Sequence, residues 1–354
     1  MTHSSIFQRA LVTSVLLSAC GLDDADANAL EQDCDELPAT PADLSAAGIN
    51  FTVSSGLTAS TSASDLTLRG SAEHKYGLAI RRIQIAGVDA VSERFNFGEW
   101  SAKINLDSLS TMPHTPDGRV NLDVQITDTC GTYARDPMTP LQVTIDVPDF
   151  TLTEAYPRVP GGDKAANYIP ADDSVTAVLT ISSDKAAAIG ARIRVDAEPA
   201  EGVTLEGLAG GAVTLAAATS GAAAEVRVRA SKAGRVTIQA RSASALNSVT
   251  LAVAGPPGFV PKAQSLQPGE LRNVAVISAG ELSECWASTS LVGLTVVLDG
   301  KDITKAPAAA AGDGKEWVLT VIADPMVAED GLGTITCRDI FLQEATLPIS
   351  VDVP

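Results

Sequence analysis

The chain has 354 residues, of which 43 are acidic and 25 are basic, and its formal net charge is −18. This excess of acid argues against nucleic acid as a partner, because phosphate binding needs a surface of lysine and arginine. It also argues against electrostatic attachment to anionic lipid. The simplest role of the negative charge is to keep the protein soluble.

The first predicted element is a short apolar run, Ala10–Leu17, which follows Arg9 and precedes small residues. A helix that spans a bilayer needs about 20 residues. The run is shorter than that, so it predicts a secretory signal peptide over residues 1–19. One interpretation is an ordinary secreted protein that is cut near Ala19.

The end of this segment reads Leu17-Ser18-Ala19-Cys20. It resembles the lipobox of bacterial lipoproteins, in which a leucine and two small residues precede the modified cysteine. The resemblance implies that Cys20 receives a diacylglyceryl group and becomes the first residue after cleavage. We therefore expect a lipid anchor in the cell envelope, at the surface or periplasmic face of a bacterial outer membrane.

Residues 20–44 hold eight acidic residues and no basic one. Such a segment repels itself and cannot bury enough apolar surface to fold, so it predicts a tether. A calcium site at Asp23, Asp24 and Asp26 is an alternative, but the loop that positions calcium ligands is missing from the sequence.

Four cysteines remain after Cys20, and an exported chain is expected to pair them. Three connectivities are possible. The simplest joins Cys34 to Cys130 and Cys285 to Cys337, each within its own third of the chain. A zinc site is the competing interpretation, and no close cysteine pair or nearby histidine supports it. We expect neither a metal nor a cofactor.

Strand signals dominate from Phe51 onward, as short alternating runs broken by Gly, Asp, Asn and Pro. Proline-bearing junctions at Val147–Phe150 and Ala254–Phe259 divide the chain into segments 45–149, 150–254 and 255–354. Each segment has the usual size of one β-sandwich. The sequence therefore predicts an all-β protein of three sandwich modules in series.

The middle segment has alternating strands over Ser174–Ile181, Thr219–Ala230 and Ala233–Ala240. Their order and turn residues resemble bacterial Ig-like domains of the invasin/intimin type, and the resemblance covers about residues 165–254. It implies an Ig-like sandwich that acts as a spacer or presents an adhesive tip. Arg227 and Arg229 are expected on its solvated face.

The first segment more loosely resembles Ig-like repeats of bacterial surface proteins, through its strands at Leu78–Ala86, Trp100–Leu106 and Val120–Asp128. Phe95, Phe97 and Trp100 could form an exposed platform for sugar, but in a chain this poor in aromatic residues we expect them in the core. Asp107, Asp128 and Asp136 could gather calcium at one pole, although no D-x-D-x-D spacing is present.

The third segment holds Cys285-Trp286 and Gly333–Arg338. It distantly resembles the cysteines that join the two sheets of immunoglobulin domains. Ile335 stands where that family has a tyrosine, and Trp317 is the better candidate for the core tryptophan. The segment is acidic, with thirteen acidic and six basic residues, and we place recognition there.

The sequence indicates no catalytic set. His74 and His114 stand in turn-like surroundings and are expected as surface or turn residues. Two adjacent carboxylate pairs, Asp172-Asp173 and Glu329-Asp330, could in principle serve a glycosidase. Neighbours on a strand point to opposite faces and so would not share a site, and we expect these acidic residues to lie in turns.

We therefore predict a non-enzymatic cell-envelope lipoprotein whose Ig-like modules act as a spacer, scaffold or adhesin-like array. Its partners would be the membrane and a protein or glycan ligand at the envelope. A carbohydrate-active or other secreted hydrolase with carboxylates on its loops is the first alternative. An assembly factor that holds a partner at a sheet edge is the second.

Overall fold

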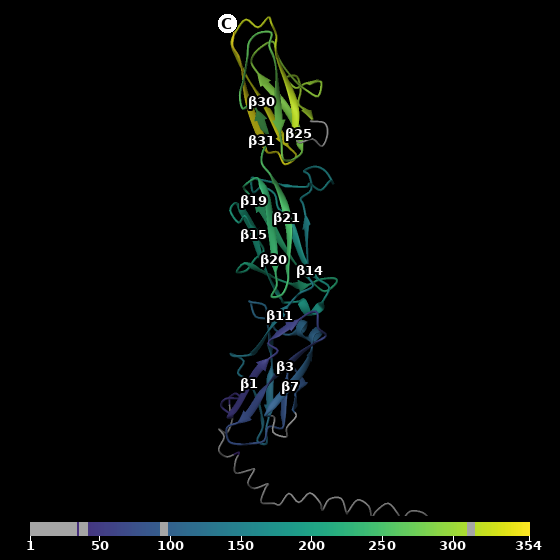
Figure 1. The fold of residues 1–354 in the computed structure, drawn as a ribbon, viewed down its shortest axis with the longest axis vertical. Helices are drawn as coiled ribbons and strands as arrows, with labels where there is room; N and C mark the ends of the chain where they lie inside the picture. The colour runs from purple at the N-terminus through teal and green to yellow at the C-terminus, as the bar shows by residue number, and fades with distance from the viewer. Residues whose placement is uncertain (1–33, 35–41, 93–97, 310–315) are drawn as a thin grey trace, which may run out of the picture. The chain divides into compact units, whose positions relative to one another are not determined.

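The computed structural model describes residue 34 and residues 42–92, 98–309 and 316–354, and these residues form an all-β protein (Figure 1). Backbone contacts divide the chain into two compact units, residues 1–145 and 146–354. The predicted fold class is confirmed. The predicted signal peptide (residues 1–19) and Cys20 lie outside the described residues, as does most of the tether.

The first unit contains one sandwich with a short 3₁₀ helix, η1 (Leu106–Thr111). Its strands are β1 (Ile49–Ser55), β2 (Thr58–Ser60), β3 (Asp65–His74), β4 (Arg82–Ile85), β5 (Val88–Asp89), β6 (Val91–Ser92), β7 (Glu99–Asn105), β8 (Arg119–Leu122), β9 (Val124–Thr127), β10 (Thr132–Ala134) and β11 (Leu141–Asp146).

These strands form sheets of order β1-β3-β7-β6, β10-β9-β4-β5 and β2-β11-β8. The stretch Val120–Asp128, expected as one strand, is interrupted at Asp123. Its first half, β8, pairs with β11, and its second half, β9, pairs with β4 and β10. The interruption splits one face of the sandwich into two small sheets.

The second unit begins with a sandwich that contains a second 3₁₀ helix, η2 (Ala186–Ala188). Its strands are β12 (Thr151–Ala155), β13 (Ile169–Pro170), β14 (Ala177–Ser183), β15 (Arg192–Glu198), β16 (Val203–Glu206), β17 (Ala212–Thr214), β18 (Ala216–Ala217), β19 (Ala222–Ala230), β20 (Gly234–Arg241) and β21 (Leu246–Ala254). We call it the middle sandwich.

The same unit ends with what we call the third sandwich. Its strands are β22 (Gly258–Val260), β23 (Gln264–Leu266), β24 (Leu271–Ile277), β25 (Leu282–Thr289), β26 (Leu294–Leu298), β27 (Lys301–Asp302), β28 (Ala308–Ala309), β29 (Glu316–Ala323), β30 (Gly331–Asp339) and β31 (Glu344–Val351).

The middle and third sandwiches share one topology. The middle sandwich has sheets β12-β14-β19-β16 and β13-β21-β20-β15-β17, and the third has β22-β24-β29-β26-β27 and β23-β31-β30-β25-β28. In immunoglobulin terms, these are an A-B-E-D sheet facing a G-F-C sheet. A short strand pairs parallel to the last strand in each case. Strand order therefore makes both sandwiches Ig-like.

Alternation of side chains fills each core. In β14 the side chains of Ala177, Leu179 and Ile181 are buried, and the residues between them are half-buried. In β29 Trp317, Leu319 and Val321 point inward in the same way, so the prediction that Trp317 is a core residue is confirmed. Inward positions carry small aliphatic residues, which explains why so few aromatics suffice.

In the described part of the chain, no helix has both the length and the apolar character that crossing a membrane requires.

Candidate functional site

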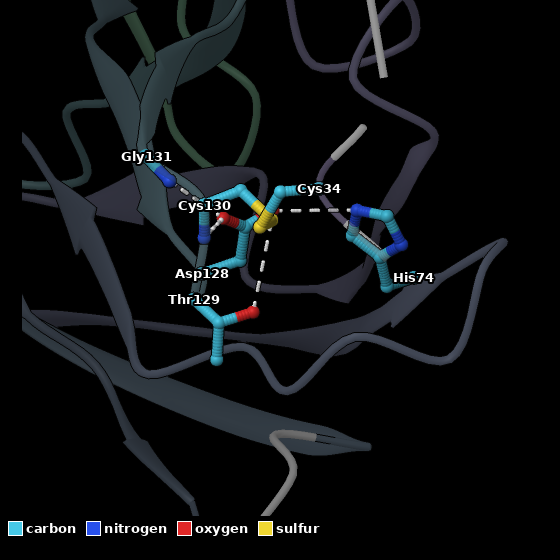
Figure 2. Close-up of a disulfide and its surroundings, with 6 residues drawn as sticks. All are labelled: Cys34, His74, Asp128, Thr129, Cys130 and Gly131. Carbon is cyan, nitrogen blue, oxygen red and sulfur yellow. Dashed lines mark hydrogen bonds and ion pairs between the residues drawn. A yellow bond between two sulfur atoms is a disulfide. The ribbon is translucent and has the colours of Figure 1, made fainter. Parts of the chain in front are cut away.

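A disulfide joins Cys34 to Cys130 beside the turn that follows β9 (Figure 2). The turn is held by Asp128, whose side chain is enclosed. Its Oδ1 accepts hydrogen bonds from the backbone N–H groups of Cys130, at 2.6 Å, and Gly131, at 2.8 Å. This disulfide links the acidic amino-terminal segment covalently to the first sandwich, in the simplest of the three connectivities considered above.

His74 ends β3. The sequence suggested a surface or turn residue, but the side chain is enclosed. Its Nδ1 accepts a hydrogen bond from the Tyr76 backbone N–H at 3.2 Å, so the neutral ring carries its proton on Nε2. That nitrogen lies 3.3 Å from Asp128 Oδ2. The pair is therefore a buried polar contact beside the disulfide (Figure 2).

The three aspartates considered for calcium do not converge. Asp107 lies in the first turn of η1, Asp128 faces His74, and Asp136 accepts a hydrogen bond from the Met138 backbone N–H at 2.8 Å. Among the described residues, no group of three His, Cys, Asp or Glu side chains could hold a metal ion. Asp23, Asp24 and Asp26 lie outside that set.

The adjacent carboxylate pairs lie in turns, as the sequence suggested. Asp172 accepts a hydrogen bond from the Ser174 backbone N–H at 2.9 Å, and Asp173 has a left-handed backbone with φ of 59°. Asp330 accepts a hydrogen bond from the Val353 backbone N–H at 2.7 Å. Asp172 thus stabilises a local backbone bend, whereas Asp330 ties the loop before β30 to the segment that follows β31.

Trp100 is buried and stacks on Phe51, with ring centroids 5.1 Å apart and an interplanar angle of 9°. It is a core residue and contributes nothing to an exposed platform. Phe95 and Phe97 lie outside the described residues.

The second disulfide joins Cys285 on β25 to Cys337 on β30. The two residues are directly opposite each other on neighbouring antiparallel strands of one sheet, with Cα atoms 4.1 Å apart. The likeness to the disulfide that joins the two sheets of immunoglobulin domains is therefore wrong. Cys285 lies on β25, which corresponds to the immunoglobulin C strand, and Cys337 lies on β30, which corresponds to the F strand. The disulfide therefore links two strands of the same sheet.

The middle and third sandwiches meet at a buried polar junction that the sequence did not predict. Tyr168 is fully buried, and its Oη donates a hydrogen bond to Asp339 Oδ2 at 3.2 Å. Asp339 also accepts hydrogen bonds from the backbone N–H groups of Phe341 and Gln343, each at 2.9 Å. The Gln343 side-chain amide donates to both Asp339 Oδ2 and the Ala254 carbonyl.

Burial shapes the ionisation of this junction. Desolvation raises the pKa of the Asp339 carboxyl, and hydrogen bonds from Gln343, Phe341 and Tyr168 partly offset that rise. Desolvation and the neighbouring Asp339 carboxyl raise the pKa of the Tyr168 hydroxyl well above its usual value. The hydroxyl therefore stays protonated and acts as a hydrogen-bond donor.

Apolar packing surrounds the polar contacts. The rings of Tyr168 and Phe341 meet edge to face with centroids 5.2 Å apart. Gly280 lies so close that an added Cβ would be 2.3 Å from the Tyr168 ring, so the position accepts no side chain. At the rim, Lys164 Nζ forms an ion pair with Glu281 Oε1 at 2.5 Å. These contacts join the middle and third sandwiches within the second compact unit.

The chain matches no family model and none of the curated proteins. Its fold is similar to that of several solved structures. A titin I-band fragment, I67–I69, is 11% identical over 86% of this chain and 98% of its own, with a TM-score of 0.31. Invasin, a bacterial integrin-binding protein, is 12% identical over 86% of this chain and 60% of its own, with a TM-score of 0.32.

The Yersinia pseudotuberculosis adhesin InvE is 12% identical over 58% of this chain and 59% of its own, with a TM-score of 0.23. Identities and TM-scores this low support no inference about what the chain does.

Proposed function

We propose that this chain is a non-enzymatic lipoprotein of the bacterial cell envelope, in which Ig-like sandwiches hold a recognition surface at a distance from the membrane. The observation that carries the proposal is the buried junction of Tyr168, Asp339 and Gln343. It joins two sandwiches into one body, which suits a spacer because joined modules keep a fixed length.

The anchor rests on Leu17-Ser18-Ala19-Cys20 and on the acidic segment that follows it. Lipid on Cys20 would hold the amino-terminal end at the membrane, and a stable hold needs more than one acyl chain. The disulfide from Cys34 to Cys130 would then limit the length of the tether, because only 13 residues separate Cys20 from Cys34.

The test is the intact mass of the mature protein, purified from its native membrane with and without reductant and iodoacetamide. The proposal expects acyl chains on Cys20 and four alkylated thiols that appear only after reduction. A mass without acyl chains, from a chain cut elsewhere, would overturn the anchor. A C20S variant that still sediments with membranes would do the same.

A further inference from the structure

One end of the third sandwich exposes large apolar side chains. Val292 is 92% exposed and Met326 86%, and each stands in a loop that joins the two sheets. Leu332, at the start of β30, is 73% exposed, and Leu271, at the start of β24, is 56% exposed. Soluble proteins scatter such residues singly, so four at one end of a small sandwich indicate an interaction surface.

The loops that carry these residues are fastened to each other. The Asp324 backbone N–H donates to the Gly293 carbonyl at 2.8 Å, so the β25–β26 and β29–β30 loops lie side by side. Asp324 Oδ1 accepts a hydrogen bond from the Met326 backbone N–H at 2.7 Å. Val292 and Met326 are therefore presented together by a fixed backbone, which lowers the entropy cost of binding.

This end lies away from the middle sandwich. Strand β30 runs from Gly331, beside the exposed Leu332, to Asp339 in the buried junction. Nine residues of strand place the two ends about 25 Å apart. Figure 1 shows the C-terminus at the same end, and the bond from the Val353 N–H to Asp330 agrees with this. The apolar end is thus open within the second unit.

The surrounding charge is acidic. The four stretches at this end, 267–272, 290–293, 324–332 and 352–354, hold five acidic residues and one basic residue. That base, Arg272, forms an ion pair with Glu270 at 3.1 Å. The acidic residues are Glu270, Asp324, Glu329, Asp330 and Asp352.

The acidic charge at this end limits the kinds of partner that could bind there. A second copy of the end would place carboxylates against carboxylates, and anionic lipid would be repelled in the same way. We propose that Val292, Met326 and Leu332 form the centre of a docking surface for a protein whose apolar pocket is rimmed by lysine or arginine. The inference rests on the proposed function, in which the array presents a recognition surface.

A library of short displayed peptides tests this chemistry. The full mature protein is the bait, and a V292S/M326S variant is used for counter-selection. Enriched peptides should combine apolar with basic residues, and should bind the variant about tenfold more weakly or worse. Their binding should weaken as salt rises, because screening reduces the attraction of the acidic rim.

A V318T variant is the matched control, because Val318 is an exposed valine of β29 away from this end and is 51% exposed. It should bind as the wild type does, and equal unfolding curves for all three proteins would show that folding is preserved. Acidic peptides, peptides that bind the V292S/M326S variant equally well, or no enrichment would each overturn the proposal.

Two further outcomes would replace the partner. Self-association that V292S/M326S abolishes would indicate a second copy. Binding to vesicles of phosphatidylglycerol that the same variant abolishes would indicate a membrane. Peptide selection does not depend on lipid at Cys20, so failure of this inference and failure of the anchor are separate results.

Discussion

Tyr168 and Asp339 are 171 residues apart in the sequence, yet the tyrosine hydroxyl donates a hydrogen bond to the buried aspartate. A Y168F variant keeps the ring and removes this bond. We expect it to lower the free energy of unfolding by about 1–2 kcal/mol near neutral pH, because the acceptor is a buried carboxylate. Chemical denaturation measures this. A loss that is equally large in acid, where the carboxyl is neutral, would contradict the reasoning.

The pKa of Asp339 also gives the junction a pH dependence. Burial raises this pKa in the folded protein. The favourable contribution of Asp339 is therefore complete below the unfolded value, about 3.9, and is lost as the pH rises through the folded pKa. Relative to D339N, the wild type should lose unfolding free energy on going from acid to neutral pH. A difference that stays constant across this range would refute the assignment.

Gly280 leaves room for the Tyr168 ring and for nothing more. In a G280A variant the new methyl group would lie 2.3 Å from the ring, so the tyrosine must move. We expect a loss of about 1–3 kcal/mol and faster hydrogen exchange near Ile169 and Phe341. G258A is the control, because its nearest neighbour is an ordinary 3.8 Å away. Equal behaviour of the two variants would show that the junction is open in solution.

The disulfide between Cys285 and Cys337 closes a loop with a sequence separation of 52 residues. Because it restricts the unfolded chain, C285A/C337A should lower the free energy of unfolding of the third sandwich by about 3–4 kcal/mol. Trp286 and Trp317 report on this sandwich by fluorescence, once Trp100 of the first unit is replaced by phenylalanine. An unchanged transition would mean that the disulfide is not formed in the purified protein.

His74 and Asp128 form an enclosed pair in the first unit. A double-mutant cycle with H74Q, D128N and both together isolates their interaction, since D128N keeps an oxygen for the Cys130 and Gly131 N–H groups. We expect a coupling energy of about 1 kcal/mol or more. Strictly additive unfolding free energies would show that the two side chains do not interact.

The alternation of apolar and polar residues predicted most of the strands. The expected strand Trp100–Leu106 is β7, and the expected strand Ala233–Ala240 is β20, each to within one residue. Both have one buried and one solvated face, so their period-two pattern is legible. The stretch at Leu78–Ala86 is strand only from Arg82, because a run of apolar residues does not reveal where pairing begins.

The junction and the apolar end were not predictable in the same way. Tyr168 lies in a loop before a two-residue strand, and nothing local shows that Asp339 is its partner. Val292 and Met326 lie in loops between the two sheets, and nothing in the sequence shows that these two loops lie side by side. The junction and the apolar end depend on which loops the topology brings together, whereas a strand can be predicted from the alternation within its own residues.

The bond between Cys34 and Cys130 has a mechanical consequence. Tension applied upstream of Cys34 would cross the sulfur atoms to Cys130 and continue toward Ile145, leaving residues 35–129 outside the loaded path. A stretched first unit would then lengthen by at most roughly 50 Å, against roughly 390 Å once the bond is reduced. The redox state of one cysteine pair would thus set how far the first unit extends under tension.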